Sequence, residues 1–126
     1  MKKTASSVSF RVKRIYDPVE AGDGLRVLID RLWPRGVSRE RAAVGLWLKE
    51  VTPSTELRQW LHSEPEGWPE FARRYRLELA QQPEAVAQLL KAARSSPVTL
   101  LSTVKDFEHS HVSVLVGFLQ KAAEQD

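Results

Sequence analysis

Apolar and polar residues alternate, cluster and then spread out along this chain in a way that separates strands from helices. Residues 8–16 alternate between apolar side chains and charged or hydroxyl ones. This period of two predicts a strand with one face in water, near the edge of a sheet. Residues 25–32 and 98–104 instead hold short, nearly continuous apolar runs. Runs of that length, bounded by glycine, proline or charged residues, predict buried strands.

Between these strands, residues 38–95 show helical spacing. Ser38 is placed to cap a short helix ending near Leu48, and Thr52 with Pro53 predicts a helix with Thr as N-cap and Pro in the first turn. Pro69 and Pro83 open two longer helices, and a last helix is predicted over residues 110–122. The apolar positions expected to face the core are Leu57, Trp60, Leu61, Phe71, Ala72, Tyr75, Leu79, Val86, Leu89, Leu90, Ala93, Val112, Leu115, Val116 and Leu119.

This order of elements predicts an α/β fold, with a small, mainly parallel sheet of about three strands flanked by helices. The helical excursion before residue 98 is what a parallel crossover requires. Residues 17–24 are too few for a crossover helix, so spacing alone allows the first two strands to pair antiparallel. We expect residues 1–7 to form a disordered tail and residues 8–126 to form a single domain.

Composition narrows the class of protein. The chain has 126 residues, of which 42% are hydrophobic and 28% charged, as in ordinary globular proteins. It has no cysteine, which excludes disulfides, a thiolate nucleophile and zinc–cysteine sites. No apolar run approaches the ~18 residues of a membrane span, and polar residues follow Met1. We therefore expect a cytoplasmic protein without a membrane partner.

Charge is spread unevenly along the chain. Residues 1–41 carry ten Lys or Arg against five Asp or Glu, whereas the remainder carries nine against eleven. Such asymmetry can indicate an anionic partner, although a charged tail and solvated faces would produce it as well. No block of five or six like charges and no basic helical stripe is present, which argues against nucleic acid. A nucleic-acid-binding module is kept as an alternative.

Candidate chemistry gathers where two predicted strands end. Asp30, Arg31, Trp33 and Arg35 follow the strand at 25–32, and Lys105 and Asp106 follow the strand at 98–104. If the two strands are parallel, their carboxyl ends meet at one edge of the sheet, where ligands of open α/β sheets bind. The last helix begins beside them, and a helix amino end favours an anion. We predict a crevice that binds an anionic small molecule, phosphorylated or nucleotide-like.

We predict a chemical role for each residue of this crevice. Asp30 or His111 would transfer protons in any acid–base catalysis, while Arg31, Arg35 and Lys105 would stabilise negative charge. Asp106 and Trp33 complete the predicted ligand-binding set. Two alternatives stay open. Asp30 could pair with an arginine and merely tie the loop to the sheet, in a purely structural or interaction protein, and His111 could serve only as a cap or hydrogen-bonding group.

Other motifs are weak. His109 and His111, with Asp106 and Glu108, meet no metal-ligand spacing rule, and His62 on an amphipathic helix is interpreted as structural. The chain has no nucleophile elbow, and the glycines at 22 and 24 match neither a dinucleotide fingerprint nor a P-loop. We therefore expect no metal and no cofactor. The sequence leaves the oligomeric state open.

Four segments carry a resemblance to a known family: KRIYDP at 13–18, VLIDRLWPRG at 27–36, TPSTELRQWLH at 52–62 and VTLLSTVKD at 98–106. With them the chain resembles the domain-of-unknown-function 488 family, in its short YeaO-like branch. The resemblance implies a compact α/β domain with a small parallel sheet, and so a parallel first connection, but no particular activity. Two positions depart from the family pattern: Ser102 stands where tyrosine is common, and Ser110 where asparagine often precedes the histidine.

Overall fold

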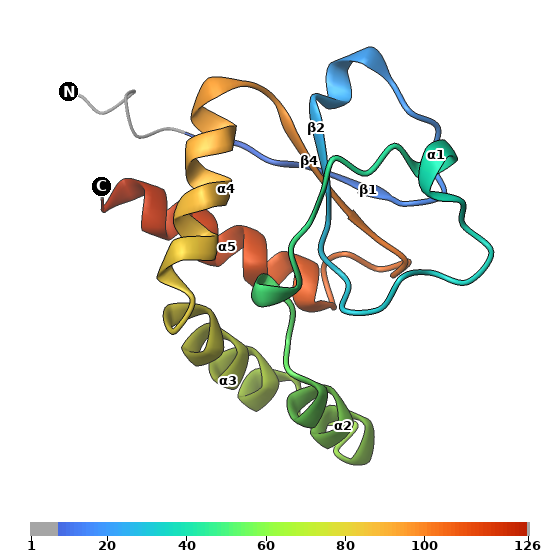
Figure 1. Ribbon diagram of the computed structural model, residues 1–126. Coiled ribbons are helices and arrows are strands. Elements are labelled where there is room, and N and C mark those ends of the chain that lie inside the picture. Colours follow the sequence, from blue (N-terminus) through green and yellow to red (C-terminus); the bar gives the residue numbers. More distant parts are fainter. Residues whose placement is uncertain (1–7, 126) are drawn as a thin grey trace.

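The computed structural model describes residues 8–125, which form a four-stranded, wholly parallel sheet with helices on both sides (Figure 1). The strands lie in the order β1, β4, β2, β3. Their bounds are β1 Arg11–Arg14, β2 Leu25–Leu28, β3 Leu46–Trp47 and β4 Val98–Ser102. The predicted α/β class is confirmed, with one more strand than expected. The tail predicted for residues 1–7 lies outside the described residues.

The first two strands do not pair with each other, because β4 lies between them. β4 pairs with β1 in the register Arg14 to Ser102 and with β2 in the register Leu28 to Leu101. The antiparallel pairing that short spacing allowed is therefore wrong, and the parallel arrangement implied by the resemblance is confirmed. The short connection of residues 15–24 suffices because β1 and β2 have only four residues each, so an extended segment can return to the start of β2. The edge position expected for the first strand is also confirmed.

The helices are α1 Arg39–Ala42, α2 Thr55–Ser63, α3 Trp68–Ala80, α4 Pro83–Ser95 and α5 His111–Glu124, with 3-10 turns η2 Ala21–Asp23 and η3 Lys49–Val51. Ser38 caps α1 as predicted, but the helix ends where Ala43 takes a left-handed φ of 50°. The predicted extension to Leu48 is therefore wrong. The N-cap of α2 is Ser54, not Thr52, because the Ser54 hydroxyl accepts from the amide of Leu57. Within residues 8–125, no helix has both the length and the apolar character needed to cross a bilayer.

Side chains of β2 and β4 alternate between two hydrophobic clusters. Val27 and Leu100 belong to the larger cluster, which also holds the buried faces of α2 to α5, whereas Leu28 and Leu101 belong to a smaller one with Ile15. Figure 1 shows α4 and α5 on one side of the strands and α1 on the other. These four side chains of β2 and β4 are fully buried, each with an exposed fraction of 0%. The strands are thus fixed from both faces, and their carboxyl ends are held in place.

A buried ionic cluster that sequence reasoning missed lies beside the smaller cluster. Asp23 is 1% exposed, and its carboxylate lies 2.7 Å from Arg26 and 3.0 Å from Lys13. Thr99 donates to the Asp23 carbonyl oxygen at 2.8 Å. The glycines around Asp23 suggested only a turn. Because Arg26 points to the opposite face from Val27, an acidic partner was needed there, and the turn supplies it.

Candidate functional site

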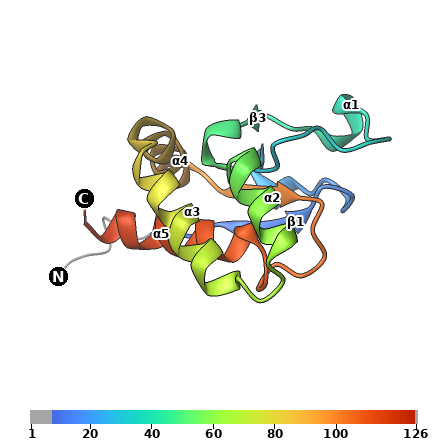
Figure 2. The same ribbon diagram turned by 90° about the horizontal axis from the view of Figure 1, so that it is seen from below.

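A cleft of about 640 Å³ opens at the carboxyl ends of β1, β2 and β4. Its walls come from residues 29–35, from residues 103–104 and 109–111, from one face of α2 and from the start of α3. On α2 the lining side chains are Arg58, Leu61 and His62, whose spacing of three and four places them on one helical face. Figures 1 and 2 show α2 next to α3, beyond the ends of the strands. The crevice predicted at this edge therefore has a helical wall that the sequence did not indicate.

Asp30 occupies the centre of this edge and is held by donors from β4. Ser102 donates its hydroxyl to Oδ1 at 2.7 Å, and the Thr103 amide and hydroxyl donate to Oδ2 at 2.8 and 3.1 Å. Burial raises the pKa of Asp30, but the hydrogen bonds from His111, Ser102 and Thr103 outweigh burial, so the pKa is lowered overall. Asp30 is thus a fixed carboxylate whose oxygens are already used by the protein.

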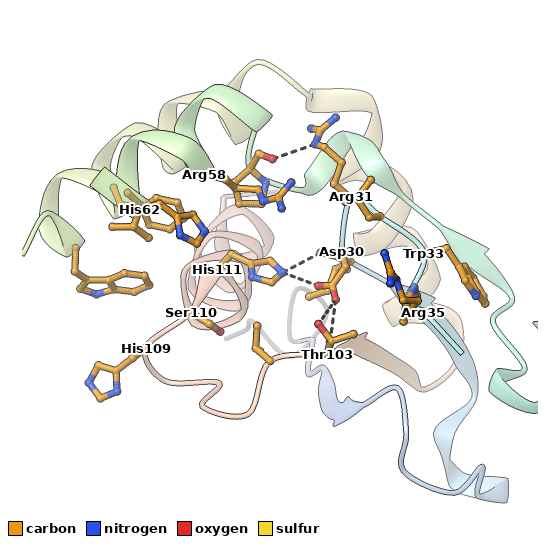
Figure 3. A pocket seen from close by; sticks show the side chains of 18 of the residues that line it. Asp30, Arg31, Trp33, Arg35, Arg58, His62, Thr103, His109, Ser110 and His111 are labelled. Atoms are coloured by element: carbon orange, nitrogen blue, oxygen red, sulfur yellow. Dashed lines mark hydrogen bonds and ion pairs between the residues drawn. The ribbon is translucent and has the colours of Figure 1, made fainter. Parts of the chain in front are cut away.

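His111, the first residue of α5, completes the arrangement (Figure 3). Its Nε2 lies 2.9 Å from the Ile29 carbonyl oxygen and 3.2 Å from Oδ1 of Asp30. Both neighbours are acceptors, so Nε2 carries a proton and donates. Within residues 8–125, Nδ1 of His111 makes no hydrogen bond. The side chain is 13% exposed and lines the cleft. Nδ1 is therefore the ring nitrogen that a ligand in the cleft can contact.

Two of the predicted ligand-binding residues are turned toward the protein. Arg31 donates to the carbonyl oxygens of Pro53 and Thr52 at 3.1 and 3.3 Å and so ties the β2 end to the segment before α2 (Figure 3). The Trp33 indole N–H donates to the Val37 carbonyl at 2.7 Å. Both side chains line the cleft, but their main hydrogen-bonding groups are occupied.

The cationic groups that remain available in the cleft are Arg35 and Arg58. Arg35 is exposed and Arg58 half-buried, and both line the cleft. Neither guanidinium makes a hydrogen bond or ion pair with any residue that the structure describes. Among the described residues, the lining of the cleft contains three arginines and a single carboxylate, Asp30. Its surface is therefore electropositive.

Lys105 and Asp106 were predicted in the same set, but the structure places them outside the lining of the cleft. Both are exposed, and Asp106 accepts from His109 at 2.8 Å on the surface. The chain turns outward after β4, so the residues that reach the cleft are Thr103 and Val104 instead. The sequence does not specify which of the polar residues after a strand turn toward the cleft.

Three contributors to the cleft were not identified from the sequence. Arg58 and Trp68 lie on helices that follow the strands by many residues, and no local pattern links them to Asp30. His62, which was interpreted as structural, is exposed at the cleft. A signal was available for His62 and Arg58, because both lie on the same face of α2 as Leu61. Nothing in the sequence indicated which way that face would point.

The family model that matches residues 9–126 is described as the inactive DUF488-N3 subclade, and the chain belongs to this family. Among its relatives, the uncharacterized protein YeaO of Escherichia coli K12 is 42% identical over 113 residues, covering 90% of this chain and 98% of YeaO. The uncharacterized protein Rv3073c of Mycobacterium tuberculosis H37Rv is 43% identical over 109 residues, covering 86% of this chain and 92% of that protein. No solved structure matches the chain significantly.

Proposed function

We propose that the cleft binds a small phosphorylated anion through Arg35 and Arg58. The observation that carries this proposal is the pair of guanidinium groups that lack an acidic partner within the described chain, in a cleft whose single carboxylate is already held by four donors. Arginine presents planar donors that match phosphate oxygens, and a partly enclosed cleft strengthens such contacts. A volume of about 640 Å³ is within the range of small-molecule sites.

Asp30 and His111 have different parts in this proposal. Asp30 acts as a positioning residue, because its oxygens are engaged and its pKa is lowered. It holds the His111 ring with Nε2–H toward the protein, which leaves the unprotonated Nδ1 to accept a hydrogen bond from a ligand hydroxyl. The family's description as inactive supports binding without turnover. We therefore propose that His111 contacts the ligand without transferring a proton to or from it.

The proposal is tested by calorimetric titration with inorganic phosphate, pyrophosphate and ribose 5-phosphate. We expect at least one of them to bind, and Arg35→Gln and Arg58→Gln each to weaken that binding by about tenfold or more, since a hydrogen bond to a charged group contributes about 1.5–3 kcal/mol. Arg76→Gln is the matched control, because Arg76 is exposed on α3 and does not line the cleft. It should bind as the wild type does.

Two results would overturn the proposal: no binding by any of the three anions, or Arg35→Gln and Arg58→Gln proteins with unchanged affinity. Release of phosphate from ribose 5-phosphate on incubation would preserve the site but contradict binding without turnover. Abolition of that release by His111→Gln would then assign the chemistry to this ring, in keeping with acid–base catalysis.

A structural role is the second candidate, and the hydrogen bonds of Asp30 favour it. They connect the end of β2 to the end of β4 and to the start of α5. In that case Asp30→Asn would lower stability, and the cleft variants would change no binding property. The titrations above therefore separate the two candidates.

A further inference from the structure

The four tryptophans of this chain differ in what covers their rings. Arg39 lies 4.4 Å from the centre of the Trp33 ring, Lys49 lies 4.2 Å from that of Trp47, and Arg74 lies 4.4 Å from that of Trp60. A cation over the face of a ring occupies the place where another planar group could stack. Three of the four indoles are therefore already partnered by the protein's own cations.

Trp68 is the exception. Within residues 8–125 no arginine or lysine lies over its ring, and its indole N–H has no hydrogen-bond partner. Trp68 is half-buried and lines the cleft. By contrast, the indole N–H groups of Trp33 and Trp47 donate to backbone carbonyls at 2.7 and 2.8 Å. The sequence had indicated Trp33 as the tryptophan of the site, whereas the available ring belongs to Trp68.

The Trp68 ring is held in position by an aromatic neighbour on one of its faces. It stacks on Phe71 with ring centres 5.2 Å apart and 24° between the planes, and Phe71 lies 5.9 Å from Tyr75. Tyr75 in turn lies 6.5 Å from the ring of His111. Phe71 and Tyr75 are 3% and 0% exposed. The rings of Phe71 and Tyr75 on α3 thus hold Trp68 and His111 at two places in one cleft. These two side chains therefore lose little conformational freedom when a ligand binds.

We infer that the ligand of this cleft carries a planar aromatic ring together with its phosphate, as a nucleoside monophosphate does, and that Trp68 stacks on that ring. The inference rests on the proposed function, which supplies the anion-binding half through Arg35 and Arg58. Trp68, Leu61 and Val104 are among the apolar residues that line the same cleft. A sugar phosphate or inorganic phosphate would leave this apolar surface in water, whereas a nucleobase would cover it.

The test compares two ligands that differ only by a planar ring, adenosine 5′-monophosphate and ribose 5-phosphate, by calorimetric titration. The wild-type protein should bind the nucleotide roughly tenfold more tightly, as stacking of one base on one aromatic side chain predicts. Trp68→Leu should remove this preference and leave the affinity for ribose 5-phosphate unchanged. Trp68→Phe, which keeps a planar ring, should retain most of the preference. The unchanged affinity of Trp68→Leu for ribose 5-phosphate shows that its loss of preference is not caused by misfolding.

Trp60→Leu is the matched control, because Trp60 is also half-buried near the α2–α3 junction but does not line the cleft. It should keep the preference for the nucleotide. Equal affinities for the two ligands in the wild type, or a preference that survives Trp68→Leu, would overturn this inference while the proposed function stands. Failure of both ligands, of inorganic phosphate and of pyrophosphate to bind would overturn both.

Discussion

Nε2 of His111 lies 3.2 Å from Oδ1 of Asp30, and this contact joins the end of β2 to the first residue of α5. The same nitrogen lies 2.9 Å from the carbonyl oxygen of Ile29. One nitrogen of the imidazole, Nε2, therefore lies next to two hydrogen-bond acceptors. Both the protonation pattern of the ring and the stability of this edge of the sheet depend on that arrangement.

The tautomer of His111 follows directly from these two contacts. Because both groups beside Nε2 accept hydrogen bonds, neutral His111 should carry its proton on Nε2. Nitrogen-15 NMR at mildly alkaline pH reports the protonated nitrogen of each histidine. His62, which is exposed and forms no hydrogen bond with the described residues, is the internal comparison and should show a mixture of tautomers. A proton on Nδ1 of His111 would contradict the arrangement.

Replacing Asp30 by Asn should destabilise the protein. The amide oxygen can replace one carboxylate oxygen, but the NH₂ group then faces donors of Ser102 or Thr103 and cannot accept from them. We expect a loss of about 1–3 kcal/mol in the free energy of unfolding, measured with urea. Asp106→Asn is the control, since Asp106 is exposed, and should change stability by less than about 0.5 kcal/mol. Equal stabilities of the two variants would show that the hydrogen bonds from Ser102 and Thr103 to Asp30 do not stabilise the fold.

The buried Asp23 predicts a loss of stability in acid. Burial raises its pKa, but hydrogen bonds from the Glu20 amide, Lys13 and Arg26 outweigh burial and lower the pKa to about 2. Its folded-state pKa is thus below the unfolded value of 3.8, so its contribution is complete above pH 3.8 and is lost as the pH falls through about 2. Urea unfolding across this range should show the decline.

Asp23→Asn should make that decline shallower, at the expense of stability near neutral pH, because Arg26 loses its charged partner. Glu70→Gln is a useful comparison, since the pKa of Glu70 is also lowered to about 2, chiefly by hydrogen bonds from Arg73 and Arg74. Glu70 is on the surface of α3, so this variant should keep most of its stability at neutral pH. An acid decline that is the same in Asp23→Asn and the wild type would contradict the assignment.

Gly24 is a position where only glycine fits. Its φ is 63°, and a Cβ built there would lie 2.1 Å from the carbonyl oxygen of Pro97. That carbonyl accepts from the Leu25 amide at 2.9 Å and starts the pairing of β2 with β4. Gly24→Ala should therefore cost more than the ~1–2 kcal/mol of a left-handed residue alone, as measured by thermal or urea unfolding.

Gly117→Ala provides the opposite case. Gly117 lies within α5, and a Cβ there meets nothing within 4 Å. Because alanine favours the helix over glycine, the variant should gain up to about 1 kcal/mol. If both glycine variants lost similar stability, the close approach of Gly24 to Pro97 would not be the cause.

Local patterns were sufficient for most elements and for two of the residues that line the cleft. The periods of two and 3.6 located the strands and the inward faces of the helices, because side-chain direction repeats with the backbone geometry of each element. Asp30 and His111 were identified because one follows a buried strand and the other begins a helix. The short β3 was missed, since two residues are too few to show a period.

Sequence patterns did not specify the direction of a side chain where it depends on packing between distant elements. Arg31 was expected to hold a ligand, and in the structure it donates to two carbonyl oxygens of the segment before α2. Asp23 was interpreted as part of a turn, but the fold buries it against Arg26. In both cases the partner lies on an element whose position no sequence period specifies.

The chain's own order of residues determined which segments are strands and helices, and it placed an acid at the end of β2 and a histidine at the start of α5. Only the tertiary structure decided that β4 enters between β1 and β2, that α2 presents Arg58 to the cleft, and that Trp68 lines the cleft. The physical reason is that secondary structure follows from hydrogen bonds and side-chain spacing within a few residues. The lining of a cleft follows from how whole helices pack on the sheet, which depends on the complete set of buried contacts.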